Sequence, residues 1–399
     1  MLTNNDKTCK KNLNIENIQY LDDWSKEINE KILKLEEISS TENITTFFSI
    51  STNTTIDTDI LNPYITPMRR LENGVIFGVV VFSQSQAIIA ANLVKDAVDN
   101  ILVDSEKKIP MQVGGNNEVL DHFGINVEIK NNKSRSYIEF GNISSAVKSV
   151  IDKEKIIEYK PNDITVDAVW TFLSIKLNIL SGKKISIIGC GNIGFKLALK
   201  LTESGANVIL HRRDATKGMH MANAINMIKS KTTIAIASFS QSALQASSLC
   251  DVLVGTANSN AQVITWDMIQ SMANNGFVVD VGKGNIEEEA LKKSYDSEVD
   301  IFRGDVMASL YGFISHNQKM QETIKHKTGR LVVEPDIELI SGGIFGKDGD
   351  IIVDNCFSPS LVYGVSDGCG HLKVKLNQKD RRRVMMLNDK INNNFLNFN

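Results

Sequence analysis

The chain has 399 residues, of which 42% are hydrophobic and 23% charged, and its formal net charge is −3 at pH 7. This length favours more than one domain, and the near-neutral charge does not favour nucleic acid or an anionic membrane surface as a partner. The five cysteines are an odd number without Cys-x-x-Cys spacing, so neither a disulfide framework nor a metal site is predicted.

The N-terminal segment lacks the apolar core of a signal peptide. The most apolar window of the chain, residues 75–82, is too short to span a bilayer. We therefore expect a cytoplasmic protein that binds a small-molecule substrate and neither nucleic acid nor a membrane, with a homodimer left open.

The first part of the chain predicts an α/β substrate domain over residues 1–162. Apolar residues in the segment 24–38 follow helical spacing, which predicts an amphipathic helix. Pro63 and Pro67 predict a rigid extended loop, and residues 74–82 predict a buried strand followed by a helix over 88–101. Residues 112–140 predict a turn, a helix and one or two strands.

A linker helix over residues 163–182 leads into the most informative stretch of the sequence. A short apolar strand, 185–188, is followed at once by Gly189-Cys190-Gly191-Asn192-Ile193-Gly194, a helical run and a second strand, 207–210. Strand, Gly-x-Gly-x-x-Gly, helix and strand within about thirty residues predict a dinucleotide-binding site. The alternative is a glycine turn that serves packing alone.

Further short apolar strands predicted at 232–237, 252–255, 277–281 and 301–303 alternate with helical segments. This alternation predicts a doubly wound parallel sheet, a Rossmann domain, over residues 183–310. The predicted fold class is therefore α/β, with an N-terminal substrate domain, a Rossmann dinucleotide-binding domain and a C-terminal extension.

The extension, residues 311–399, begins with a return helix over 308–325. Lys347-Asp348-Gly349-Asp350 predicts a turn, and hence a β-hairpin between Ile344 and Ile351. Residues 364–370 predict a flexible loop, and the basic run 379–383 predicts a solvated helix face.

Each glycine of the dinucleotide loop has a predicted role. Gly189 permits the tight turn, Gly191 lets the backbone approach a pyrophosphate, and Gly194 lets helix and strand pack closely. The diphosphate is expected on the unpaired N–H groups at the start of the helix, where Asn192 and Ile193 lie.

Cofactor choice is predicted from the end of the second strand. NAD enzymes place an acidic residue there for the ribose hydroxyls, whereas this chain has His211, Arg212 and Arg213. Guanidinium groups would bind the 2′-phosphate of NADP, so NADP is the predicted cofactor. The alternative is two solvated arginines.

The nicotinamide half of the cleft is expected where the fourth and fifth strands end, because ligands bind beyond the carboxyl ends of parallel strands. The residues at these two points are Thr256 and Ala257, and Val281 and Gly282, the latter followed by Lys283.

The arrangement resembles the two-domain superfamily that includes methylenetetrahydrofolate dehydrogenase, shikimate dehydrogenase and glutamyl-tRNA reductase. The matching segments are Gly182-Lys183, Gly189–Gly194, His211–Arg213, Asp280–Gly282, Gly304–Val306 and, distantly, Ser341–Gly346. The Tyr-x-x-x-Lys pair of the folate enzymes is absent, since none of the seven tyrosines has a lysine four positions on. Thr66–Arg69 is loosely similar to the Thr-x-Pro-x-Lys of shikimate dehydrogenase. The resemblance thus implies the cofactor half but not the reaction.

The catalytic proton donor is expected in the first domain. Lys107 or Lys108, beside Asp104 and after the apolar segment 101–103, is the leading candidate, because burial can lower a lysine pKa into the working range. A charged surface turn is the plainer interpretation. Weaker candidates are Asp121 and His122, Ser83–Gln86, and Asp367 with His371.

Two functions from different classes follow. The first is an NADP-dependent oxidoreductase that transfers a hydride between nicotinamide and a small polar carbonyl, imine or amino-acid-like substrate. The second is a non-catalytic dinucleotide-binding sensor or scaffold. Internal use of the cofactor by a lyase or hydrolase is a lesser third.

Overall fold

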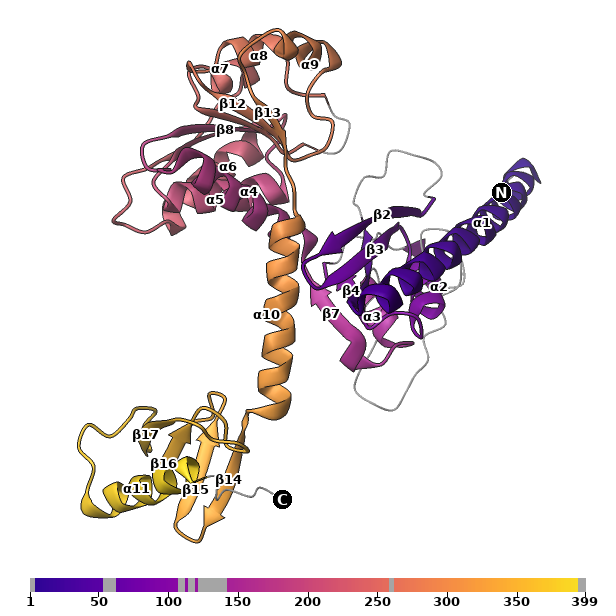
Figure 1. Cartoon of the computed structure of the whole chain (residues 1–399). Helices are drawn as coiled ribbons and strands as arrows, with labels where there is room; N and C mark the ends of the chain where they lie inside the picture. The colour runs from indigo at the N-terminus through magenta and orange to yellow at the C-terminus, as the bar shows by residue number, and fades with distance from the viewer. Residues whose placement is uncertain are drawn as a thin grey trace. The chain divides into compact units, whose positions relative to one another are not determined.

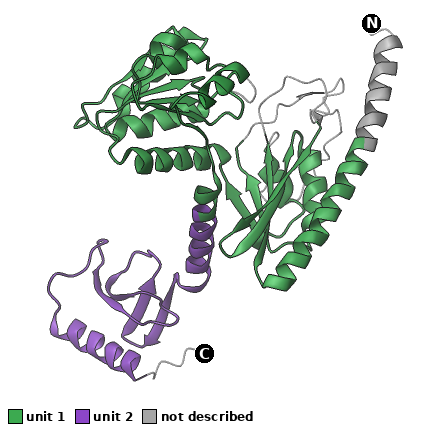
Figure 2. Ribbon diagram, turned by 45° about the horizontal axis from the view of Figure 1, so that its top comes forward, with its two compact units in different colours: residues 1–311 green, residues 312–399 purple. Residues whose placement is uncertain are grey.

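The computed structural model describes residues 4–52, 62–106, 112–113, 119–120, 142–257 and 262–393. The chain divides into two compact units, residues 1–311 and 312–399 (Figure 2). Neither unit contains, among these residues, a helix long and apolar enough to cross a membrane.

Among the described residues, the first unit contains two large sheets (Figure 1) and one two-stranded pair. The N-terminal sheet has the strand order β2-β3-β1-β4-β7, in which only β2 is antiparallel to its neighbour. Its strands are β1 (Thr45–Thr52), β2 (Tyr64–Leu71), β3 (Gly74–Val81), β4 (Asn100–Asp104) and β7 (Ile156–Tyr159). A separate short pair joins β5 (Gln112–Val113) and β6 (Val119–Leu120).

Helices α1 (Asn4–Glu42), α2 (Gln84–Val94) and α3 (Ile143–Lys148) cover one face of this sheet (Figure 1). Trp24, Ile28, Ile32 and Leu35 of α1 enter its core, so the predicted amphipathic helix is present, although Leu33 is 67% exposed. Side chains on the opposite face remain available to line a site.

Several predictions for this part were wrong. Residues 63–67 were expected as a loop, but residues 64–71 form the edge strand β2, where a proline is tolerated because one row of N–H groups needs no partner. The helix expected over 88–101 ends at Val94, and β4 begins at Asn100. Strands β1 and β7 were not predicted. The helix expected within 112–140 lies outside the described residues.

The second sheet confirms the predicted doubly wound fold. Its six parallel strands have the order β10-β9-β8-β11-β12-β13, so the strand order reverses between β8 and β11. The strands are β8 (Lys184–Ile188), β9 (Asn207–His211), β10 (Ala237–Phe239), β11 (Val252–Gly255), β12 (Phe277–Asp280) and β13 (Ile301–Arg303). The third strand therefore begins at Ala237 rather than within 232–236.

Helices cover both faces of this sheet, which explains why its central strands are mostly apolar. Ile185 and Ile187 enter one core with α4 (Pro161–Leu177), α5 (Asn192–Glu203) and α6 (Ala215–Ile228). Ile188 enters a second core with α7 (Ala243–Ser247), α8 (Trp266–Gln270) and α9 (Glu288–Tyr295).

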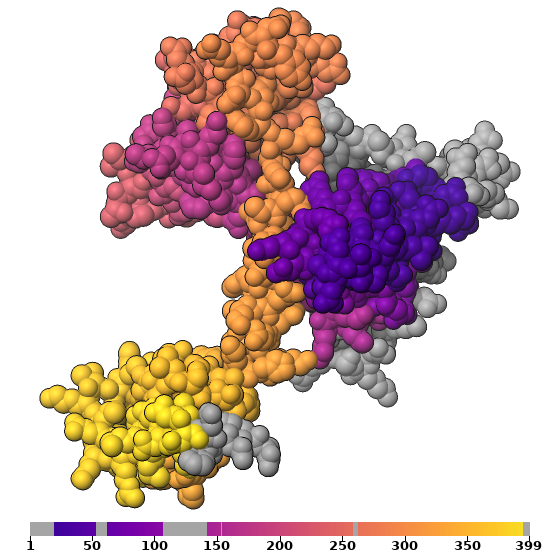
Figure 3. Space-filling view, in the orientation of Figure 1, coloured from indigo at the N-terminus to yellow at the C-terminus, as the bar shows by residue number. Residues whose placement is uncertain are grey.

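Helix α10 (Met307–His326) leads into the second unit, which has a four-stranded sheet of order β14-β15-β16-β17 packed against α11 (Gln378–Asn392). In the space-filling view its yellow residues gather into one body (Figure 3). The strands are β14 (Gly329–Glu334), β15 (Ile337–Ser341), β16 (Asp348–Val353) and β17 (Val362–Asp367).

The extension contains the predicted hairpin, but at another position. It joins β14 to β15 around Pro335-Asp336, whereas Asp348-Gly349-Asp350 lies in β16, parallel to β15. Residues 362–367 form a strand rather than a loop. Arg383 of the basic run is 9% exposed and bonded to Asp380, so that helix face is not wholly solvated.

Candidate functional site

The glycine loop between β8 and α5 has room for a side chain at Gly191 but not at Gly189 or Gly194. Gly189 has φ +84°, and a Cβ there would lie 2.5 Å from the Cβ of Ala257. A Cβ on Gly194 would lie 2.6 Å from Oγ1 of Thr256 and 3.1 Å from Ile187. A Cβ on Gly191 would meet only the carbonyl oxygen of Gly189, at 3.9 Å.

This pattern fits a bound pyrophosphate. Gly191 is the N-cap of α5 and has no side chain to bond the first N–H groups of the helix, which begins with Asn192 and Ile193. An anion at this end would accept from those groups and lie at the positive end of the helix dipole. The residues present therefore fit the diphosphate of a dinucleotide.

The end of β9 is tied to the glycine loop. The carbonyl oxygen of His211 accepts from the N–H groups of Gly189 and Cys190, at 3.0 and 3.2 Å. The Nη1 of Arg212 donates to the carbonyl oxygen of Cys190 at 3.1 Å. Arg213 is exposed, and Asp214 caps α6 by accepting from the N–H of Lys217. Both arginines thus stand beside the loop, with Arg213 the more open to solvent.

A buried asparagine joins the loops that follow β11 and β12. The Oδ1 of Asn285 accepts from the N–H of Ala257 at 2.9 Å, and the carboxylate of Asp280 accepts from the N–H of Gly284 at 2.7 Å. Gly282 is required here, since a Cβ would lie 2.2 Å from the carbonyl oxygen of Ala257. Lys283, at the tip, has φ +60°, a strained conformation for a non-glycine residue.

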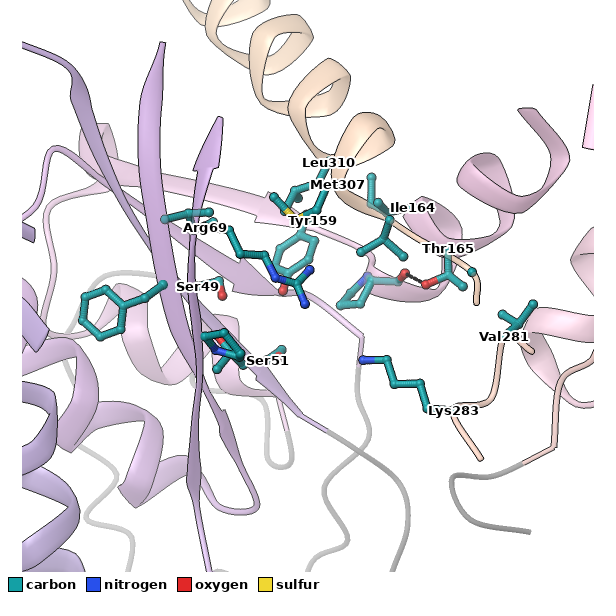
Figure 4. A pocket seen from close by; sticks show the side chains of 17 residues that line it. Ser49, Ser51, Arg69, Tyr159, Ile164, Thr165, Val281, Lys283, Met307 and Leu310 are labelled. Atoms are coloured by element: carbon teal, nitrogen blue, oxygen red, sulfur yellow. Dashed lines mark hydrogen bonds between the residues drawn. The ribbon is translucent and has the colours of Figure 1, made fainter. Parts of the chain in front are cut away.

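A pocket of about 250 Å³ borders this second loop (Figure 4). Its walls come from the N-terminal sheet, the start of α4, the loop after β12 and the start of α10. Two cations, Arg69 and Lys283, reach into it, and none of the described residues that line it is acidic. The lining includes Ser49, Ser51, Thr66, Ile76, Tyr159, Thr165, Val281, Met307 and Leu310.

In the sheet wall of the pocket, a glycine on β3 stands opposite a serine on β1. Gly78 pairs with Ser49, and a Cβ on Gly78 would lie 2.0 Å from the Ser49 Oγ. The missing side chain therefore makes room for the Ser49 hydroxyl on the face without helices.

Ser51, Asp104 and Tyr159 lie in one row across β1, β4 and β7. Asp104 pairs with Tyr159, and Ser51 follows Ile50, which pairs with Val103, so the three side chains share a face. Asp104 is fully buried and accepts from the N–H of Glu106 at 2.8 Å. Burial and the nearby charge of Asp104 raise the pKa of Tyr159, and a hydrogen bond with Ser51 offsets only part of the rise.

The predicted catalytic residues lie in different parts of the chain, and among the described ones only some are near the pocket. Asp104 lies in this row between Ser51 and Tyr159, which line the pocket. Lys107 and Lys108 lie outside the described residues, as do Asp121 and His122. Ser83 caps α2 by accepting from the N–H of Gln86, which is a structural role. Asp367 accepts from the N–H groups of Cys369 and His371 and so shapes its own turn in the second unit.

Residues 158–309 match the family model of the D-isomer specific 2-hydroxyacid dehydrogenase NAD-binding domain. This part of the chain has a Rossmann-type fold. The predicted resemblance to two-domain Rossmann dehydrogenases is confirmed for this half, and a nicotinamide dinucleotide is the cofactor it indicates. No curated relative matches the chain in sequence.

The chain is similar in fold to several solved structures, among them the following three. Glutamyl-tRNA reductase from Methanopyrus kandleri is 16% identical with a TM-score of 0.31, and the match covers 40% of each chain. Cinnamyl alcohol dehydrogenase from Sorghum bicolor is 15% identical with a TM-score of 0.31, over 45% of this chain and 46% of that one. One dipicolinate synthase subunit from Bacillus halodurans is 14% identical with a TM-score of 0.33, over 70% and 98%. The chain spans less than half the length of the first two.

Proposed function

We propose that the protein is an NADP-dependent oxidoreductase that transfers a hydride between nicotinamide and a small polar carbonyl, imine or amino-acid-like substrate. One observation carries the proposal. The loop after β12 belongs to the dinucleotide-binding domain, and its residues Val281 and Lys283 also line the pocket. A ligand in the pocket would therefore lie next to the expected position of the nicotinamide.

The properties of the pocket suit such a substrate. Its volume of about 250 Å³ limits the ligand to a small molecule. Hydroxyl groups of Ser49, Ser51 and Thr66 offer hydrogen bonds, while Ile76 and Leu310 exclude water. The cofactor supplies the hydride, and the protein supplies alignment and hydrogen bonds to the group that is reduced.

The preference for NADP rests on Arg212 and Arg213. Both stand at the end of β9, next to the glycine loop. From the start of this strand, Asn207, up to Arg213 there is no acidic residue; the first is Asp214. A 2′-phosphate would find cationic donors there and no carboxylate in the position that binds the ribose of NAD.

The test is turnover by the purified chain. NADPH is incubated with panels of small carbonyl compounds, imines and amino acids, and its absorbance is followed against the Gly191→Val variant. Turnover that disappears in the variant supports the proposal. Tight NADPH binding in calorimetry, without turnover across the panels, would instead favour the sensor or scaffold function.

A further inference from the structure

The row of Ser51, Asp104 and Tyr159 holds a phenol at the wall of the pocket. Tyr159 is 8% exposed and ends β7, so its backbone is fixed by pairing with β4 while its side chain borders the ligand space (Figure 4). A side chain held on a strand is positioned more exactly than one held on a loop.

The neighbours of Tyr159 make it a hydrogen-bond donor. Tyr159 and Ser51 share the pocket face of the sheet, and the Ser51 Oγ donates to the carbonyl oxygen of Val79 at 3.3 Å. Hydrogen bonding with Ser51 acts to lower the pKa of the Tyr159 phenol. When Ser51 turns its proton to the phenol oxygen, the Tyr159 O–H becomes available to a ligand. Two hydroxyls in series polarise one another, which strengthens the terminal donor.

The carboxylate of Asp104, which pairs with Tyr159 on the neighbouring strand, opposes a second negative charge on the phenol. An ionised tyrosine would accept hydrogen bonds, whereas a neutral one can donate to an oxygen or nitrogen that gains negative charge. Neutral donors placed where charge develops stabilise the transition state without transferring a proton themselves.

We infer that Tyr159, supported by Ser51, donates the hydrogen bond that stabilises the reacting oxygen or nitrogen of the substrate. The substrate is then a carbonyl or imine whose heteroatom points at the N-terminal sheet while its reacting carbon faces the side of Val281. The carbon receives the hydride of the reduced nicotinamide, and the heteroatom takes its proton from water. This inference rests on the proposed oxidoreductase function. The sequence suggested Lys107 or Lys108 as the proton donor, whereas this inference gives the stabilisation of the reacting heteroatom to a tyrosine and a serine.

The experiment compares Tyr159→Phe with Tyr64→Phe. Tyr64 lies in the same sheet, on β2, and does not line the pocket. Its variant therefore removes a tyrosine hydroxyl from the same sheet but not from the pocket, and serves as the control. The Tyr159 variant should lower kcat and kcat/KM equally, by roughly 10²–10³-fold, with KM and NADPH affinity unchanged. The Tyr64 variant should retain the activity of the unaltered chain.

Ser51→Ala provides the second variant and should lower kcat by about tenfold without altering NADPH affinity, since it removes only the supporting hydroxyl. If Tyr159→Phe does not fold, this variant decides the matter. Full activity in a folded Tyr159→Phe, or in Ser51→Ala when the former fails to fold, overturns the inference and leaves the oxidoreductase intact. Absence of turnover in the unaltered chain overturns both.

Discussion

The guanidinium of Arg212 is bonded to the glycine loop itself, donating from Nη1 to the carbonyl oxygen of Cys190 at 3.1 Å. Its neighbour Arg213 is exposed. The two arginines at the end of β9 thus have different surroundings, and their substitutions should have different effects on cofactor binding.

Arg213→Ala should selectively weaken NADP binding. A hydrogen bond to a charged group is worth about 1.5–3 kcal/mol net, which corresponds to a roughly tenfold to hundredfold change in Kd. The affinity for NAD should stay unchanged, because no ribose phosphate is present to lose a partner. Calorimetry with both cofactors at low and at high salt measures the difference, which salt should reduce.

Arg212→Ala should weaken both cofactors severalfold, since the bond that holds the Cys190 carbonyl is lost whichever dinucleotide binds. The same titrations report this result. A purely NADP-selective effect of Arg212→Ala would show that the contact with Cys190 does not order the loop.

Substitution by alanine should affect cofactor affinity at Gly191 and stability at Gly194. Gly191→Ala should change the free energy of unfolding by no more than about 0.5 kcal/mol, because its Cβ points into open space. It should still reduce dinucleotide affinity, because the added methyl group obstructs the phosphates. Gly194→Ala should destabilise the domain by about 1–3 kcal/mol, because its Cβ would press on Thr256 and Ile187. Equal stabilities for the two variants would contradict the predicted packing.

The Rossmann half was predictable because burial on both faces makes its central strands predominantly apolar. Segments such as 185–188 and 252–255 therefore stand out from the sequence, and the glycine loop fixes where the first one ends. The site in the N-terminal sheet had no comparable signal. Strand β1, with the sequence TTFFSIST, alternates apolar and hydroxyl residues over Phe48–Ser51, and its many threonines and serines give it the composition of a polar connection.

That alternation is itself the signature of a half-buried strand, since Phe48 and Ile50 face the helices while Ser49 and Ser51 face the pocket. Period two could have identified Ser51 as a site residue. Tyr159 was beyond reach, because β7 has only four residues and its place beside β4 depends on long-range pairing. The hairpin was misplaced since Asp348-Gly349-Asp350 has the composition of a turn, although Asp350 is 5% exposed and paired with Arg330.

The second unit should lose stability in acid through Asp380. Burial would raise the pKa of this carboxyl, but hydrogen bonds and charges from Lys373 and Arg383 outweigh it and lower the pKa below its usual value. The folded chain then binds fewer protons than the unfolded chain, so the contribution is complete above about pH 4 and disappears as the pH falls through the folded pKa.

Asp380→Asn tests this contribution. It should cost about 1–3 kcal/mol near neutral pH and flatten the acid limb of the unfolding profile, because the uncharged amide cannot pair with either cation. Asp389→Asn, at an exposed position of the same helix, is the control and should change neither. An unchanged acid limb in Asp380→Asn would assign the acid sensitivity to other carboxylates.

Lys283 should show a conflict between stability and substrate binding. Its φ of +60° costs a lysine about 1–2 kcal/mol, which glycine does not incur, while the greater backbone freedom of glycine costs roughly 0.5–1 kcal/mol on folding. Lys283→Gly should therefore be at least as stable as Lys283→Met, which keeps the strained backbone and loses the charge. Since the pocket contains cations and its described lining has no acidic residue, both variants should raise KM for negatively charged substrates, by roughly tenfold to hundredfold, and leave KM for neutral ones nearly unchanged. Thermal unfolding of the two variants tests the predicted stabilities, and steady-state kinetics tests the predicted KM values. An unchanged KM for anionic substrates would mean that the ammonium group does not contact the substrate.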